Sequence, residues 1–377
     1  AGIAAPPGAR QRVAPLWAIR PQPGWPDGPE DTSMRMVAVS GMDAHGDECT
    51  IQVPSAWVPR FEPGSVQRLR FGLRETVYTA RLASDPRSSV IWKEITEHSE
   101  EAAREVKMSQ RLSSFATMGF NHARGHIVSH FDVLPLPGAI YIMMEAPDMT
   151  LQKLLKTQQG APMDLASALP IFIDVLRGLA FLDDAGICHG GFSPDSVVLK
   201  DGRALLDRVE SMCYVFDDRD PQLTCSACRD ASTPSVFEES KFGISATLQA
   251  PEVEHGCPTG PTDHAWTAAL MLAMMRMGRN PVERLVEGSF QDHVAFAVHD
   301  MLSDGRDDIR DLIRDDFEIE EDPGFASLDP GEQSLLKGML NKDAPKRWTA
   351  KQALAAALRL ADERRVEVPP ERPAPSA

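Results

Sequence analysis

The sequence predicts an α+β protein with a strand-rich first half and a helix-rich second half, preceded by an N-terminal extension. Up to about residue 147, short apolar runs alternate with polar residues, which is the pattern of β-strands. Beyond that point, apolar residues recur at helical spacing. The chain has 377 residues, 42% hydrophobic and 25% charged, which is enough for two lobes with buried cores.

Charge and hydropathy exclude two classes of partner. The formal net charge is −16 and no dense run of Lys and Arg is present, so we expect no nucleic-acid-binding surface. No stretch of about 18 apolar residues is present either, so we expect no membrane span.

The region ahead of the main fold has two parts. Residues 1–33 are rich in Pro and Gly and are expected to be extended. In residues 34–59, two apolar runs flank the turn-like "GMDAHGD", which predicts a hairpin-like extension. The predicted boundaries that follow are 60–147 for the N-lobe, 148–365 for the C-lobe and 366–377 for a flexible tail.

Five strand-like runs and one helical stretch make up the predicted N-lobe. The helical stretch is "EEAAREVKMSQRL", at residues 100–112. The strand-like runs are "VQRLRFGL", "TVYTARL", "SVIWKEI", "HIVSHFDVL" and "AIYIMME".

Two helices stand out in the predicted C-lobe. Residues 165–185 carry apolar side chains at helical spacing, and Gly186 follows the end, as expected for a C-cap. Residues 265–278, "AWTAALMLAMMRMG", are apolar and Met-rich throughout, which predicts a buried central helix.

Short motifs then connect this pattern to a known fold. "SVIWKEI" resembles the third-strand Val-Ala-Ile-Lys motif of protein kinases, which makes Lys93 the phosphate-pairing lysine. Glu105, or Glu101 one turn earlier, is its expected helix partner. Such a pair acts either as an internal brace or as a remnant of nucleotide binding.

Three later segments match the same family in the same order. "LQAPEV" contains the Ala-Pro-Glu motif, ending at Glu252. "DHAWTAA" resembles the Asp-x-Trp segment through Asp263 and Trp266, and "NKDAPKRWTA" resembles the late Asp-Pro-x-x-Arg segment through Arg347. Together the motifs resemble a bilobal protein-kinase fold, which implies an ion pair between Glu252 and Arg347.

The segment "ICHGGFSPDSVVL", Ile187 to Leu199, aligns without a gap to the kinase catalytic loop His-Arg-Asp-Leu-x-x-x-Asn. His189 is kept. The catalytic Asp becomes Gly191, the following Lys becomes Ser193, and the metal-binding Asn becomes Ser196. Phosphoryl transfer needs a carboxylate near the attacking hydroxyl and oxygen ligands for Mg²⁺, and glycine offers neither.

The second metal position is also changed. Counting from Gly202 places the Asp-Phe-Gly motif on "RVE", so that Arg208 replaces the Mg²⁺-binding Asp. A slip of one residue would make Asp207 the ligand instead, but a one-residue step along a strand turns the side chain to the opposite face. We therefore expect no metal site and no cofactor.

The expected nucleotide-binding segments are altered as well. In "RFGLRETVY" only Gly72 keeps a glycine position, and Glu75 would repel phosphate. In "MMEAPD", Met144 takes the gatekeeper position, and Pro147 lies where a backbone N–H normally binds adenine. Proline has no N–H, so nucleotide binding is expected to be poor.

Six cysteines are too few for a disulfide scaffold. A disulfide among Cys213, Cys225, Cys228 and Cys257 would require an oxidising compartment, and unpaired thiols are an equal alternative. A zinc site from Cys225, Cys228, His255 and Cys257 is a third alternative, although the spacing is not that of a standard zinc finger.

The segment "HGGFSPDSVVLKDGRALL" resembles the secreted rhoptry-kinase family of apicomplexan parasites. This resemblance implies a catalytically inactive protein-binding or regulatory module, secreted into the vacuole or cyst compartment, with a parasite or host protein as partner. The alternatives are a transferase that reuses Asp207 or Asp195, although Asp195 is equally a capping residue, and a sensor of a non-nucleotide ligand. The acidic stretch at residues 303–322 is either a docking surface or a solvated helical face.

Overall fold

The structure is a computed structural model that describes residues 35–71, 75–85, 87–96, 105–112, 123–136, 139–214, 246–253, 261–289 and 306–371. The chain divides into two compact units. The strand unit comprises residues 1–103 and 132–143, and the helical unit comprises residues 104–131 and 144–377. The described part of the predicted helical stretch, residues 105–112, is helical and belongs to the helical unit.

A seven-stranded sheet forms the strand unit, in the order β2-β1-β3-β4-β5-β7-β6. Each of the five predicted runs contains a strand and the predicted hairpin-like extension is present, but residues 126–129 of the run "HIVSHFDVL" precede β6, which begins at His130. The strands are β1 (Met36–Met42), β2 (Glu48–Pro54), β3 (Gln67–Phe71), β4 (Glu75–Arg81), β5 (Ser89–Ile95), β6 (His130–Leu136) and β7 (Ala139–Glu145).

The extension joins the sheet through one close approach. β1 and β2 pair antiparallel, and β1 meets β3 in parallel at Met42 and Gln67. A Cβ at Gly41 would lie only 2.7 Å from the Val66 carbonyl oxygen, so this junction needs glycine.

An aromatic cluster fills the core beneath this sheet. Trp92 on β5 stacks on Tyr78 and Phe61, with ring centroids 5.0 and 5.2 Å apart, and Trp57 meets it edge-on. The Trp57 indole donates to Asp132 at 2.9 Å. Because Trp57 and Phe61 come from the region around the extension, that region contributes directly to the core of the strand unit.

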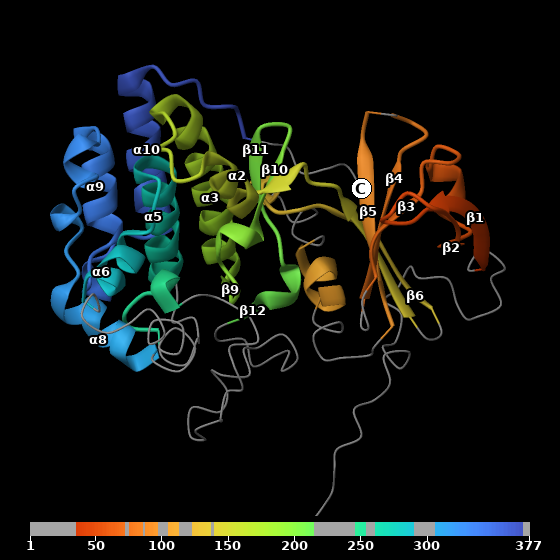
Figure 1. Ribbon diagram of the computed structural model, residues 1–377, viewed down its shortest axis with the longest axis horizontal. Coiled ribbons are helices and arrows are strands. Elements are labelled where there is room, and N and C mark those ends of the chain that lie inside the picture. Colours follow the sequence, from red (N-terminus) through yellow and green to blue (C-terminus); the bar gives the residue numbers. More distant parts are fainter. Residues whose placement is uncertain are drawn as a thin grey trace, which may run out of the picture. The chain divides into compact units, whose positions relative to one another are not determined.

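Helices form most of the second unit, and α3, α5, α9 and α10 pack side by side (Figure 1). The helices are α2 (Leu151–Gln158), α3 (Leu165–Ala185), α5 (Pro261–Met277), α6 (Pro281–Ser289), α8 (Arg306–Asp316), α9 (Pro330–Met339) and α10 (Ala350–Arg364). The short 3₁₀ helices used below are η5 (Pro194–Ser196) and η6 (Val209–Ser211).

The two predicted helices of this unit are confirmed. Asp164 caps α3 by accepting from the Ser167 backbone at 2.8 Å, and Gly186 ends it with φ of 67°. Among the described residues, α3 alone is long and apolar enough to cross a membrane, but 78% of its apolar window is buried in the protein. α5 is buried nearly all round, as its Met-rich sequence predicts.

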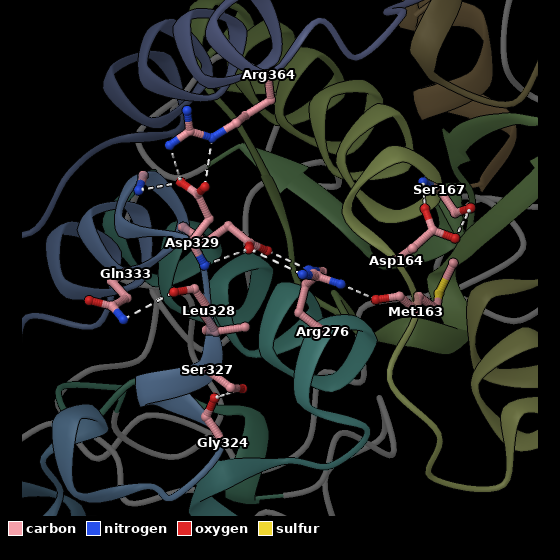
Figure 2. Close-up of polar contacts among 12 residues, drawn as sticks. Met163, Asp164, Ser167, Arg276, Gly324, Ser327, Leu328, Asp329, Gln333 and Arg364 are labelled. Atoms are coloured by element: carbon pink, nitrogen blue, oxygen red, sulfur yellow. Dashed lines mark hydrogen bonds and ion pairs between the residues drawn. The ribbon is translucent and has the colours of Figure 1, made fainter.

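An arginine network ties α5 to its neighbours (Figure 2). Arg276 donates to both carboxylate oxygens of Glu332 on α9, at 2.5 and 3.2 Å, and to the Met163 carbonyl. Glu332 is fully buried and also accepts from the Asp329 backbone. Asp329 in turn binds Arg364 of α10, so one chain of charges links three helices.

Two small sheets frame the segment that resembles a catalytic loop. One has the order β11-β10-β8, from β11 (Arg203–Leu206), β10 (Val197–Lys200) and β8 (Met149–Thr150). The other pairs β9 (Ile187–His189) with β12 (Met212–Tyr214).

Candidate functional site

The loop from His189 to Ser196 connects β9 to β10 within the helical unit. A backbone hydrogen bond attaches the loop to the end of η6: the Gly190 N–H donates to the Ser211 carbonyl at 3.0 Å. The Phe192 N–H turns back to the His189 carbonyl at 3.2 Å. The loop is therefore a tight turn with its own internal bonds.

His189 joins the two halves of the site. Its Nε2 donates to the Asp207 carbonyl at 2.8 Å, and its ring lies against Phe192. Burial, together with the charge of His264, lowers the pKa of His189 to about 3. His189 is therefore a neutral, structural donor in this loop.

His264 on α5 is the residue that the sequence analysis missed. The backbone N–H of His189 donates to His264 Nε2 at 3.0 Å, so α5 holds the start of the loop. The assignment of Asp263 to the Asp-x-Trp motif is wrong by one residue, because that spacing counted back from Trp266 gives His264. The motif's own spacing was the signal that would have found it.

Two carboxylates surround this histidine. Asp183 lies 3.9 Å from His264 Nδ1, and Asp263 lies 4.0 Å from Nε2. Burial lowers the pKa of His264, but these carboxylates act more strongly in the other direction, so its pKa is raised. Protonation of Nε2 would remove the bond from His189, because that bond needs an acceptor.

Ser193 and Ser196 form a reciprocal capping box around η5. The Ser193 N–H donates to Ser196 Oγ at 2.9 Å, and Ser196 Oγ donates to the Ser193 carbonyl at 2.8 Å. Ser196 is fully buried. Its hydroxyl proton and one lone pair both form hydrogen bonds within the loop, so the Ser196 oxygen stabilises this turn.

The "DRVE" turn follows β11. The Asp207 N–H donates to the Ser196 carbonyl at 2.8 Å, and its own carbonyl accepts from His189, so the Asp207 backbone is held on both sides. Arg208 adopts the left-handed conformation, with φ of 60° and ψ of 50°. Its guanidinium lies 3.6 Å from Glu210 and is 37% exposed. A cation thus stands at the predicted metal position.

The other loop positions considered in the sequence analysis are Asp195, whose side chain is exposed, and two glycines, which have no polar side chain. Asp195, in the first turn of η5, is exposed. Gly190 and Gly191 are not among the described glycines with positive φ, unlike Gly186 and Gly202. The backbone of the loop therefore does not require glycine at position 191.

The predicted ion pair between Glu252 and Arg347 is present, 95 positions apart in the sequence. Arg347 binds both carboxylate oxygens of Glu252, one of them at 2.8 Å. It also donates to the carbonyls of Asn341 and Thr262, at 2.8 and 3.1 Å. Its guanidinium lies 5.0 Å from the Trp266 ring. The Arg347 side chain is fully buried, so this pair is part of the core.

The remaining predicted site residues are divided between the two units. Lys93 lies on β5 of the strand unit and Glu105 is buried in the helical unit, so their pairing stays a prediction. Glu75 on β4 forms an ion pair with Arg70, and Gly72 lies outside the described residues.

The connector and cysteine predictions are only partly described. Met144 is buried at the end of β7, and Pro147 is half-buried just beyond it. Of the predicted disulfide or zinc residues, Cys213 lies on β12. The others, Cys225, Cys228, His255 and Cys257, lie outside the part of the chain that the structure describes.

Comparison with known proteins agrees with the fold. Homeodomain-interacting protein kinase 1 of Caenorhabditis elegans is 22% identical over 174 residues, which cover 46% of this chain. Serine/threonine-protein kinase MPS1 of Saccharomyces cerevisiae is 22% identical over 227 residues, or 58% of the chain. The dual specificity protein kinase YAK1 homolog of Arabidopsis thaliana is 26% identical over 155 residues, or 41%.

The chain has a bilobal, protein-kinase-like fold. No protein-family model matches it. The matched segments make up only 18%, 27% and 14% of the three kinases, so the resemblance concerns a minor part of each of those proteins.

Proposed function

We propose that this kinase-like chain is a catalytically inactive module that acts by binding another protein. The observation that carries the proposal is Gly191, which stands at the catalytic Asp position of a loop that aligns without a gap. A general base at that position is worth about 10²–10⁴ in rate, and Mg²⁺ ligands are needed in addition.

The geometry of the loop supports the proposal at the metal positions. Ser196, at the Asn position, is buried, and its hydroxyl is engaged in the capping box. Arg208, at the Asp position, carries a fixed positive charge beside Glu210. A guanidinium repels a divalent cation, so the substitution opposes metal binding instead of merely weakening it.

The binding part of the proposal rests on resemblance. The "HGGFSPDSVVLKDGRALL" segment is similar to secreted rhoptry kinases of apicomplexan parasites and, within them, to a bradyzoite pseudokinase of Toxoplasma. By that resemblance we propose secretion into a vacuole or cyst compartment and a parasite or host protein as the partner.

Two alternatives are a nucleotide-dependent transferase with reused residues and a sensor of a non-nucleotide small molecule. The first needs a carboxylate facing a substrate. Asp195 is exposed on η5 and the Asp207 backbone is held inside the turn, and neither observation favours such a role.

A melting experiment tests the loss of the nucleotide site. A ligand that binds only the native state, at 100 times its Kd, adds about 2.7 kcal/mol of stability, which is readily visible as a melting shift. We expect millimolar Mg²⁺–ATP to leave the melting temperature of the purified chain unchanged. A magnesium-dependent rise would contradict the proposal, and a rise with ATP that is independent of magnesium would favour the nucleotide-dependent transferase alternative.

Affinity capture from the native source, followed by quantitative mass spectrometry, tests the partner. The matched control is the Arg347→Ala variant, in which the helical unit is destabilised. We expect a protein that is enriched on the parent chain and lost on the variant. The absence of any such protein would remove the binding part of the proposal while leaving the catalytic part intact.

A further inference from the structure

Two cysteines face each other across the smallest sheet of the helical unit. Cys188 on β9 and Cys213 on β12 are direct partners in the antiparallel ladder. Both side chains are buried, each with 3% exposure. The sequence analysis grouped Cys213 with cysteines further along the chain, because nothing in the local pattern reveals this pairing.

The backbone geometry at this pair suits a disulfide. Two positions along the same ladder, the Gly190 N–H donates to the Ser211 carbonyl, which makes Cys188 and Cys213 a hydrogen-bonded pair. Cα atoms of such pairs lie about 5.5 Å apart, and those of the other kind of pair about 4.5 Å. Disulfides span Cα separations of roughly 4.4–6.8 Å, so the Cα separation is within reach. Their Cβ atoms lie about 3.5–4.5 Å apart, against about 4.5–5.5 Å for directly opposite residues, so bond formation requires the two strands to approach slightly.

A bond between Cys188 and Cys213 would enclose the candidate site, because the two residues flank it in the sequence. Cys188 precedes His189 at the start of the loop, and Cys213 directly follows the η6 turn that Arg208 begins. The segment between the two cysteines contains the whole loop, the β10–β11 hairpin and the "DRVE" turn. A bond between them would close this segment into a ring at its base.

We propose that Cys188 and Cys213 form a reversible disulfide that locks the degenerate catalytic loop. The oxidant is a low-molecular-weight disulfide such as oxidised glutathione. One cysteine thiolate attacks the small disulfide, releasing one small thiol and forming a mixed disulfide. The second cysteine thiolate then attacks the cysteine sulfur of that mixed disulfide and releases the second small thiol. The two cysteines lose two electrons and two protons in total, and the small disulfide gains them.

Access to the buried sulfurs comes from opening of the small sheet. Within the part of the chain that the structure describes, β9 and β12 pair over three residue positions without a third strand. All six residues are buried, so the sulfurs become accessible by local unfolding of this short ladder, which breaks fewer backbone hydrogen bonds than unfolding a core helix. Closing then restores the register that holds the two sulfurs opposite each other.

The test is peptide mapping of the full chain after incubation with oxidised glutathione under native conditions. Trypsin is expected to release Cys188 in residues 178–200 and Cys213 in residues 209–219, each as the sole cysteine of its peptide. We expect these peptides to be joined, to separate on reduction, and to be accompanied by a rise of several degrees in melting temperature.

Matched variants separate this pairing from others. Cys188→Ala should abolish the joined peptide, whereas Cys49→Ala, on β2 of the strand unit, should leave it unchanged. A disulfide from Cys213 to the peptide of residues 220–229, which holds Cys225 and Cys228, would overturn the proposal. So would recovery of Cys188 and Cys213 as thiols under conditions in which Cys49 becomes glutathionylated. Mapping the parent chain does not depend on whether any variant folds.

Discussion

The loop at residues 189–196 and the ion pairs of the helical core are both built from polar residues, but they differ in what those residues do. Around the core, Arg347 and Arg276 each hold a carboxylate through two oxygens, and both carboxylates belong to distant elements. In the loop, His189 Nε2 and the Ser196 hydroxyl bind backbone carbonyls of the site itself, and His189 also contacts the side chains of Ser211 and His264.

This difference distinguishes residues that a kinase needs for catalysis from residues that it needs for stability. A carboxylate that takes part in catalysis can be lost without unfolding the protein, because water replaces its contacts. A buried ion pair cannot lose one partner so easily, because the remaining charge stays buried. The kinase-like residues that persist in this chain, Glu252 and Arg347, are of the second kind.

The largest effect is expected at the core pair. Arg347→Ala should destabilise the protein by roughly 3–5 kcal/mol, because it leaves Glu252 and two backbone carbonyls without their donor. Chemical denaturation measures this as a lower unfolding midpoint. Lys346→Ala, which removes an exposed neighbouring charge, is the control and should unfold like the parent. Equal midpoints for the two variants would mean that the pair does not support the core.

A pH-dependent effect is expected at His189. Its pKa is about 3 in the folded protein and about 6.5 when unfolded, so the unfolded chain binds the extra proton. The stability due to the neutral ring is therefore present above pH 6.5 and is lost as the pH falls toward 3. His189→Gln still offers a donor for the Asp207 carbonyl but does not titrate.

The measurement is the unfolding free energy of both proteins across this range. We expect stability to fall more steeply with acidification in the parent than in His189→Gln. Parallel curves would show that His189 is not the neutral buried donor described above.

A smaller effect is expected at the capping box. Ser196→Ala removes the acceptor for the Ser193 N–H and should cost about 1 kcal/mol, the usual loss for a capping side chain. Asp195→Ala, one residue away and exposed, should change the midpoint little. If the two variants proved equally stable, Ser196 would not be held as the structure describes, and its oxygen would again be a candidate ligand.

The smallest effect is expected from restoring the chemistry. Gly191→Asp alone should not produce phosphoryl transfer, because Ser196 and Arg208 still occupy the metal positions and the catalytic groups act as a unit. Transfer of radiolabelled phosphate to a generic substrate measures this, with a melting curve to establish that the variant is folded. Activity in the folded variant would show that one residue separates this chain from an enzyme.

The sequence predicted those features that depend on local pattern. Short strand-like apolar runs located β3 to β7, and a capping glycine located the end of α3. Glu252 and Arg347 were paired correctly because each lies in a motif of its own, so no long-range geometry had to be worked out.

What the sequence did not reveal depends on contacts between distant segments. His264 was missed because an aspartate stands directly before it, although the spacing to Trp266 identifies it, and the bond from the His189 N–H shows its role. The pairing of Cys188 with Cys213 depends on the register of two three-residue strands, which are too short to carry a pattern. The extension's contribution to the aromatic core was likewise not predicted, since Trp57 and Phe61 lie in irregular segments.

The left-handed backbone at Arg208 bears on which residues suit the position that aligns with the metal-binding Asp of kinases. A long side chain at φ of 60° is strained, whereas aspartate, asparagine and glycine tolerate that conformation better. The backbone at this turn therefore favours the return of an aspartate over the arginine that is there now. At position 191 the backbone is not among the described positive-φ conformations, so φ alone does not favour glycine over aspartate there.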